Sequence, residues 1–212
     1  MKKLLHIAAM LLLCISVFYR YKSFDRQEND KFRQGAQDMT LYQRFINLDM
    51  DFSRIGFFAE DDRYRYFCTP ENGRIIGSMG VDGVHFCMVD GCGDMIFAVN
   101  PIPPGDVYVY PVAENFADFL GLVLATGSTN VLDQLYYMDR DGYDSLMNSR
   151  SNVDFITAPQ HIEILQKIQR LGVQPIETPY EYVKKLQAEF DYSKIKFSDE
   201  FYADTCTDNS LM

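Results

Sequence analysis

Carboxylates are the side chains of this chain whose number and spacing could support chemistry. No Lys or Arg occurs between Ile75 and Asp139, whereas eight acids do: Asp82, Asp90, Asp94, Asp106, Glu114, Asp118, Asp133 and Asp139. Acids in such numbers could supply the pair of carboxylates that hydrolyses a glycoside, but no local pattern selects two of them. Two interpretations remain open: a charged surface that keeps the protein in solution, and a face that docks a cationic partner.

A metal centre is the second chemistry that the sequence invites. His85 and Cys87 are two residues apart, so on a strand both side chains project from one face, and Cys68 or Cys92 could join them. A zinc site needs four ligands, which usually include a CxxC pair, and no such pair occurs. The sequence therefore predicts no bound metal.

Other chemical motifs fail on their spacing. The stretch DRDGYD at 139–144 resembles part of a calcium loop, in which Asp141 and Gly142 would take positions 5 and 6. The ligands required at positions 1 and 12 would then be Tyr137 and Asn148, so a helix cap explains the stretch better. GCGDMI contains only a fragment of the dinucleotide fingerprint, and no P-loop, GxSxG or HExxH motif occurs. The sequence predicts no cofactor and no enzyme.

The net charge is strongly negative and unevenly distributed. The 212 residues carry a formal charge of −10, and residues 1–38 contain seven basic and four acidic side chains, so residues 39–212 carry −13. A field of this sign repels nucleic acids and anionic membranes and attracts basic partners. We therefore expect a basic protein partner and no nucleic acid.

The first 38 residues have two explanations, which the sequence leaves open. Residues 4–18 are apolar and lie between basic residues, a pattern typical of a signal anchor in the inner membrane. Alternatively, Gln34-Gly35-Ala36 can be encoded by a ribosome-binding sequence placed before Met39. In that case Met39, rather than Met1, is the true start, and residues 1–38 are a gene-calling extension.

The cysteines and one histidine bear on the cellular compartment and on the core. The five cysteines show no regular framework, which is typical of reduced, buried thiols in a cytoplasmic protein, and two of them, Cys68 and Cys87, lie in strand-like runs. His161 lies in a segment rich in charge, so we expect it at the surface. The polar residues 203–212 are expected to form a flexible tail.

An antiparallel meander is predicted for the middle of the chain. Short apolar and aromatic runs alternate with turn signals, several of them Asp-Gly, which favours hairpins between neighbouring strands. Five strands are predicted, within residues 63–69, 74–80, 84–89, 95–100 and 107–112. In the last of these, Tyr108 and Tyr110 are expected to pack in the core or at an interface.

Helical periodicity flanks the meander. Residues 39–50 form one amphipathic segment, and after Pro111 the stretch ENFADFLGLVLATG has a helical stripe with Asn115 as N-cap and Gly127 after its end. Further helices are expected from Ser128, and at 141–148, 159–172 and 178–190, whereas 149–158 is expected to be a loop; Thr178 and Glu181 suggest a capping box. Residues 39–202 are thus predicted to form a single α+β domain.

The hairpin region also resembles a known family. The stretch FFAEDDRYRYFCTPENGRIIGSMGVDGVHFCMVDGCGDMIFAVNP, followed by VYPVAENFADFLGLVLATG, is similar to bacterial proteins of the SUKH superfamily, the Smi/Knr-like group. The likeness covers about Gly56 to Met147. It implies a compact α+β domain without catalysis, and many members are immunity proteins that bind and neutralise a toxin of a polymorphic toxin system, often a nuclease.

These observations give one functional hypothesis and one alternative. The chain is expected to be a non-catalytic module that neutralises a basic, nuclease-type toxin in the cytoplasm. Acids at or beside the turns are the expected contacts: Glu60, Asp61, Asp62, Asp82, Asp90, Asp94 and Asp106. The alternative is an envelope protein anchored by residues 4–18, with the domain as its binding head. The cognate toxin, the oligomeric state and a housekeeping role are left open by the sequence.

Overall fold

The computed structural model describes residues 39–205 of the chain. The chain divides into two units, residues 1–44 and 45–212, and the fold reported below is that of the second unit. The helix predicted for residues 39–50 is shorter than expected, since α2 spans only Leu41–Ile46. The apolar residues 4–18, the Met1 start and most of the predicted tail lie outside the described residues.

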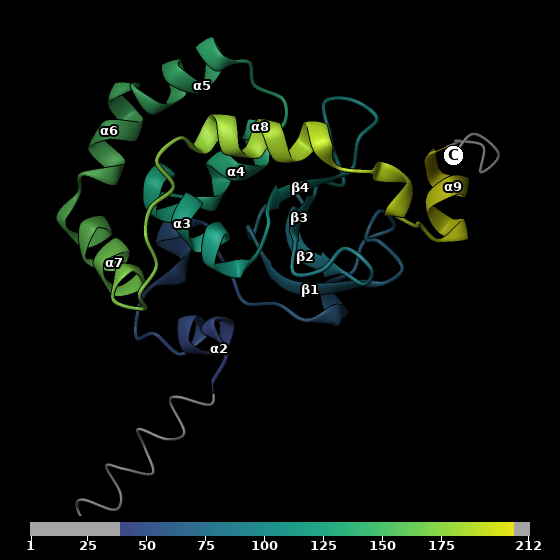
Figure 1. The fold of residues 1–212 in the computed structure, drawn as a ribbon, viewed down its shortest axis with the longest axis horizontal. Helices are drawn as coiled ribbons and strands as arrows, with labels where there is room; N and C mark the ends of the chain where they lie inside the picture. Colours follow the sequence, from purple (N-terminus) through teal and green to yellow (C-terminus); the bar gives the residue numbers. More distant parts are fainter. Residues whose placement is uncertain (1–38, 206–212) are drawn as a thin grey trace, which may run out of the picture. The chain divides into compact units, whose positions relative to one another are not determined.

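A four-stranded antiparallel sheet in the order β1-β2-β3-β4 forms the centre of the domain (Figure 1). Its strands are β1 (Gly73–Ser78), β2 (His85–Val89), β3 (Ile96–Val99) and β4 (Val109–Ala113). Each strand pairs with the next along the chain, as the predicted meander requires. Asp82 and Gly83 have φ values of 52° and 71°, and the Val84 amide donates to the Val81 carbonyl. This is the Asp-Gly hairpin turn that the sequence predicts.

The prediction of a fifth strand at residues 63–69 was wrong. This segment begins with the 3-10 helix η2 (Asp62–Tyr64) and continues in turns. The guanidinium group of Arg65 donates to the carbonyl oxygens of Gly73 and Pro70, at 2.8 and 2.6 Å. These bonds hold the segment as a compact loop beside β1. Cys68 is buried as expected, but in this loop rather than in a strand.

Both faces of the sheet are covered, which is why its strands consist of almost continuous buried residues. One face packs Phe86 and Tyr110 against the helical side of the domain, where Phe119 contacts Phe86 at a ring-centroid distance of 5.0 Å. The other face contributes Cys87, Phe97 and other residues to a second cluster, which the C-terminal segment closes with Ile195 and Phe201. Tyr110 is fully buried, as its alternation with apolar residues predicts.

The helices begin and end largely where sequence signals place them. The side chain of Asn115 accepts from the Asp118 amide at the start of α3, and Gly127 ends that helix with a φ of 83°. Ser128 and Asp139 cap the next two helices in the same way. The helices of this part are α3 (Phe116–Thr126), α4 (Thr129–Leu135), α5 (Arg140–Met147), α6 (Arg150–Ile156), α7 (Pro159–Gln169), α8 (Pro179–Glu189) and α9 (Asp199–Thr205).

Several helical predictions need correction. Residues 149–158, expected as a loop, contain α6, because Ser149 caps a helix by accepting from the Asn152 amide. The capping box at Thr178 is absent, since its side chain makes no cap hydrogen bond. The predicted tail begins too early, because α9 continues to Thr205. His161 is buried, not exposed, since α6 and Phe155 lie against it.

The short helices complete the described chain. The 3-10 helix η1 (Phe52–Ile55) precedes the sheet, and η3 (Tyr192–Lys194) links α8 to α9. Figure 1 shows α5, α6 and α7 following one another along the side of the domain away from α9. Among residues 39–205, none of the helices has the length and apolar character needed to span a bilayer.

Candidate functional site

The structure divides the predicted contact acids between two ends of the sheet. Ser78 of β1 pairs with His85 of β2, so the loop 79–84 lies at the same end as the loop 100–108 that precedes β4. We call this the two-loop end; it carries Asp82 and Asp106. The loop 90–95, with Asp90 and Asp94, lies at the opposite, one-loop end. The seven acids therefore do not form a single face.

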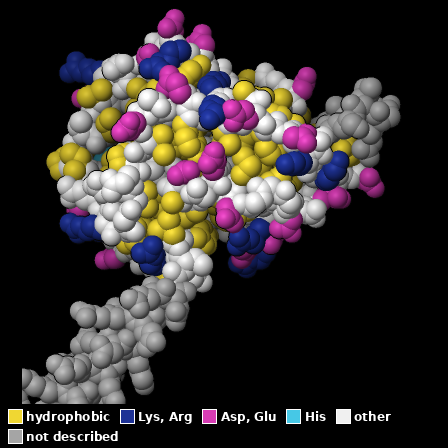
Figure 2. Space-filling view, viewed as in Figure 1, with side chains coloured by type: hydrophobic (Ala, Val, Ile, Leu, Met, Phe, Trp, Pro, Cys, Tyr) yellow, Lys and Arg dark blue, Asp and Glu magenta, His cyan; other side chains and the backbone are white. Residues whose placement is uncertain are grey.

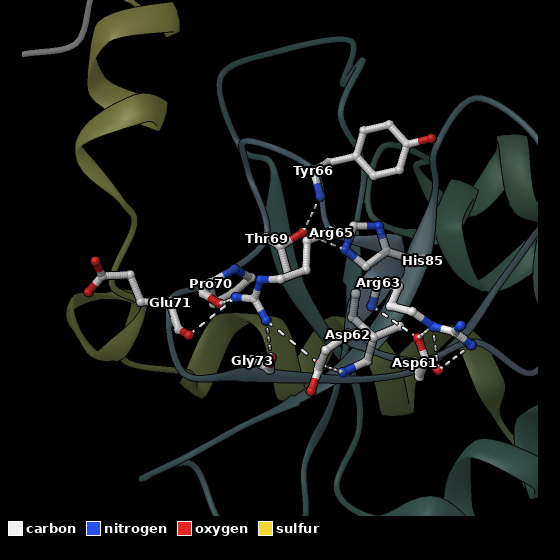
Figure 3. A network of polar contacts seen from close by, with 11 residues as sticks. Asp61, Asp62, Arg63, Arg65, Tyr66, Thr69, Pro70, Glu71, Gly73 and His85 are labelled. Carbon is white, nitrogen blue, oxygen red and sulfur yellow. Dashed lines mark hydrogen bonds and ion pairs between the residues drawn. The ribbon is translucent and has the colours of Figure 1, made fainter.

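The three acids at 60–62 each have a partner within the chain, and Figure 3 shows Asp61 and Asp62 with theirs. Asp61 pairs with Arg63 at 2.8 Å, and this guanidinium group holds the pKa of the Asp61 carboxyl below its ordinary value. Asp62 accepts from the Ile75 amide at 3.2 Å. Glu60 accepts from the Ser78 hydroxyl at 3.3 Å. These carboxylates help to fix the loop against the sheet.

Exposed hydrophobic side chains distinguish the two-loop end. Phe58, Tyr66, Val81 and Ile102 have exposed fractions of 40, 40, 54 and 72%, and we call these four side chains with Glu60 and Asp82 the two-loop patch. Glycines bring them together. A Cβ atom on Gly80 would lie 2.5 Å from the Phe58 ring, and one on Gly83 would lie 2.6 Å from the Tyr66 ring and 3.0 Å from Pro101. The rings therefore pack directly on the backbone of the turn.

The buried side chain of His85 contacts two parts of this patch, the turn at Gly83 and the ring of Tyr66. Its Nδ1 lies 2.8 Å from the Gly83 carbonyl oxygen and its Nε2 lies 3.0 Å from the Thr69 hydroxyl. A carbonyl only accepts, so Nδ1 carries the proton and Nε2 accepts from Thr69. Burial lowers the pKa of His85, which keeps the ring neutral in this arrangement.

The imidazole of His85 also supports the aromatic part of the patch. The Tyr66 ring stacks on it, with centroids 5.8 Å apart and planes at 25°, and the Tyr66 amide donates to Thr69 Oγ1. Figure 3 shows the Tyr66 hydroxyl pointing away from this network. Tyr66 is thus an exposed side chain fixed on a rigid base.

A buried carboxylate supports the second loop of this end. Asp133 of α4 accepts from the Tyr110 hydroxyl at 2.5 Å and from the Asn100 amide at 3.2 Å. The side-chain oxygen of Asn100 in turn accepts from the Ile102 amide at 2.9 Å. Burial raises the pKa of the Asp133 carboxyl, because the charged form loses its solvation by water. No cation among the described residues pairs with this carboxylate.

Asp133 is one of the eight acids between Ile75 and Asp139, and nothing in the sequence indicates a role for it. The apolar stripe of α4 predicts the helix, and it gives no signal that one acid of the helix turns inward. The partner side chains Asn100 and Tyr110 are 33 and 23 residues away. Tyr66, Phe58 and Ile102 were missed for a related reason, since only the fold shows that they are exposed at one end of the sheet.

The one-loop end is built differently. Asp90 and Asp94 are exposed there, and Cβ atoms on Gly91 and Gly93 would meet nothing within 4 Å. Cys92 between them is buried against the sheet. This end presents carboxylates on an open loop, without the exposed aromatic side chains of the other end.

The thiols do not form a metal centre among the described residues. Cys68, Cys87 and Cys92 are free and buried in one apolar cluster, and no group of three metal-ligating side chains occurs within residues 39–205. Burial raises the pKa values of Cys68 and Cys87 to about 12, so both remain protonated thiols. Both ring nitrogens of His85 are hydrogen-bonded, to the Thr69 hydroxyl and the Gly83 carbonyl, so neither is free to bind a metal.

Acidic side chains occur both over the middle and along the rim of the face drawn in Figure 2. On the face drawn in Figure 2, hydrophobic side chains are exposed over the middle with Asp and Glu among them, whereas Lys and Arg lie mostly toward the rim.

Comparison of the chain with protein-family models, with curated proteins and with solved structures finds no match in any of the three. The resemblance to the SUKH superfamily therefore stays a prediction from the sequence.

Proposed function

We propose that this chain is a non-catalytic binding module of the immunity type, which neutralises a basic protein toxin through the two-loop patch. The observation that carries the proposal is the composition of that patch. Four exposed hydrophobic side chains lie at the same end of the sheet as the turn that bears Asp82, two of them with their rings on the backbone of the loop 79–84, and Asp82 forms no ion pair within residues 39–205. Protein interfaces commonly combine an aromatic centre with a polar rim.

The rigidity of the patch supports a protein partner. Tyr66 rests on the buried ring of His85, and the amide of Ile102 is held through Asn100 by Asp133. A side chain that is ordered before binding loses less entropy when the complex forms. A pre-ordered anchor residue such as Tyr66 therefore favours tight binding to a protein partner through an interface of ordinary area.

The charge of the domain supports a basic partner. Residues 39–212 carry a formal charge of −13, and the stretch from Ile75 to Asp139 contributes no basic side chain. A nuclease binds phosphate and is commonly basic at its active site, so an acidic patch would be attracted to that site and would cover it. Within this proposal, the SUKH-like sequence pattern and the reduced state of the buried thiols favour a cytoplasmic immunity protein.

A pull-down from the native host with a tagged full chain tests the proposal. We expect one stoichiometric basic protein, released by high salt, whose toxicity in a naive host is relieved by co-expression of this chain. The variant pair Tyr66→Ser and Asp82→Asn should weaken that complex at least about tenfold, the change expected on losing one anchor residue. The matched pair Asp90→Asn and Asp94→Asn, at the one-loop end, should leave it unchanged.

The outcomes separate the alternatives. If membrane proteins alone co-purify with the chain, the envelope-anchor hypothesis replaces the immunity hypothesis. If a basic partner binds both variant pairs equally, the partner uses another surface and the assignment to the two-loop patch is wrong. Circular dichroism of each variant shows that a loss of binding does not reflect unfolding.

A further inference from the structure

A separate cavity lies where the C-terminal segment closes over the sheet. It has a volume of about 360 Å³ and is formed by three parts of the chain: the start of β4 with the residues before it, η3, and α9. Its lining residues are Asp106, Val107, Tyr108, Val109, Tyr192, Ser193, Ile195, Phe197, Phe201 and Thr205. Ligand sites of proteins commonly measure about 300–1,000 Å³, so the cavity suits a small molecule.

The walls of the cavity are aromatic and firmly packed. Phe197 and Phe201 stack with centroids 3.9 Å apart and planes at 14°, and Tyr108 meets Phe201 edge to face at 5.2 Å. Phe67 supports both Tyr108 and Phe201 from outside the cavity. Flat aromatic faces of this kind bind planar apolar groups and cations.

The charge of the lining selects the sign of a ligand. Asp106 is the one formally charged side chain among the lining residues, it is exposed, and it forms no ion pair within residues 39–205. The carboxylate of Asp191, close in sequence to η3, differs because it accepts from the amide and the hydroxyl of Ser193. Lys194 lines a different hollow, beside Gly91 and Phe190 at the one-loop end.

We propose that this cavity binds a small organic cation whose apolar body packs on the aromatic lining formed by Tyr108, Phe197 and Phe201 and whose ammonium group reaches Asp106. The aromatic walls and the single carboxylate at the β4 side are complementary to such a molecule, and an anion of the same shape would be repelled. This inference does not depend on the toxin-binding proposal, because the variants that test it leave Tyr66 and Asp82 intact.

Tryptamine is a suitable probe for a direct test with the full chain. The protein contains no Trp, so the indole fluorescence of the probe reports its binding without interference from protein indole. We expect saturable binding of tryptamine, about tenfold tighter than that of indole-3-acetate, which has the same ring and the opposite charge. Replacement of Asp106 by Asn should weaken tryptamine binding about threefold to fivefold and leave the uncharged 3-methylindole unaffected.

Two further variants and a control complete the test. Val107→Phe should fill the cavity and abolish binding of all three indoles, and Phe197→Ala, which removes part of one wall, serves if that variant does not fold. Asp90→Asn removes one charge at the one-loop end and should leave every affinity unchanged. The proposal is overturned if tryptamine does not bind at millimolar concentration, if indole-3-acetate binds equally well, or if folded Val107→Phe and Phe197→Ala proteins both bind tryptamine like the parent chain.

Discussion

The two ends of the sheet carry the same kinds of residue, aspartates next to glycines, and they differ in what lies beneath them. At the two-loop end the loop 79–84 packs against the rings of Phe58 and Tyr66, and a buried histidine bonds to its Gly83 carbonyl. At the one-loop end Gly91 and Gly93 face open space. A shared Asp-Gly signal thus produces glycines packed under aromatic rings in one place and glycines that face open space in the other.

A charged turn therefore becomes a candidate interface when buried groups fix it. Each loop of the two-loop end depends on one buried polar residue, His85 for the first and Asp133 for the second. Both residues are costly to bury, and both are hydrogen-bonded: His85 through its two ring nitrogens and Asp133 through Oδ1. The predictions below test whether the two ends differ as much in energy as they do in contacts.

The largest effect is expected from alanine at the supported turn. Both Gly83 and Gly91 have left-handed backbones, with φ values of 71° and 89°, so alanine costs about 1–2 kcal/mol at either position. At Gly83 the added methyl group also displaces the Tyr66 ring, and we expect a total loss near 3 kcal/mol of unfolding free energy. Urea denaturation of Gly83→Ala and Gly91→Ala measures both values, and equal losses would show that the packing of the turn contributes nothing.

The second loop is tested through the buried hydroxyl of Tyr110. The Tyr110→Phe variant leaves the Asp133 carboxylate with one side-chain donor fewer, and we expect a loss of about 2 kcal/mol at neutral pH, as for a bond to a charged acceptor. Thr126→Val is the control, because its buried hydroxyl donates to a neutral carbonyl, that of Leu122, and should contribute only about 1 kcal/mol. Similar losses for the two variants would argue against an ionised Asp133.

The pH dependence gives a separate test of the Asp133 carboxylate. Because burial raises its pKa in the folded state, the folded protein retains this proton at pH values at which the unfolded chain has lost it. Stability should therefore decrease as the pH rises from the ordinary value of 3.8 through the raised pKa, and Asp133→Asn should remove this contribution. Denaturation midpoints of parent and variant across the acidic range measure the difference.

The two buried histidines within residues 39–205 provide a smaller and more selective comparison. Burial lowers the pKa of both rings, so the unfolded chain takes up protons first and stability decreases as the pH falls below the ordinary value of 6.5. His85 has two hydrogen-bond partners, whereas neither ring nitrogen of His161 has one among the described residues. We expect His85→Leu to cost about 1–2 kcal/mol at pH 8, and His161→Leu to cost nothing or to stabilise.

Both leucine variants should become less sensitive to acid than the parent chain, because each removes one group that binds a proton only after unfolding. Thermal melts at several pH values separate this effect from the loss at pH 8. A large loss for His161→Leu at pH 8 would indicate that its ring takes part in an interaction of the folded state, contrary to its apolar surroundings beside Phe155.

Local signals predicted most of the elements, and long-range contacts account for what they missed. Asp82-Gly83, Asn115 and Ser128 act within four residues of their own positions, and turns and caps appear where they stand. The strand predicted at 63–69 does not form, because the Arg65 guanidinium donates to the carbonyls of Pro70 and Gly73 and holds the segment as a loop. The candidate site depends on pairs such as Asp133 with Asn100, which no periodicity in the sequence connects.

The smallest stability effect should come from the acids that led to the functional hypothesis. Asp82 and Asp90 are exposed and unpaired within residues 39–205, so replacement of either by Asn should change the unfolding free energy by less than about 0.5 kcal/mol. Chemical denaturation checks this. The two variants should differ only when a cationic partner is present. Asp82→Asn should reduce the salt dependence of association with that partner, and Asp90→Asn should not. Equal salt dependence for the two variants would mean that the whole acidic field, rather than one supported patch, attracts the partner.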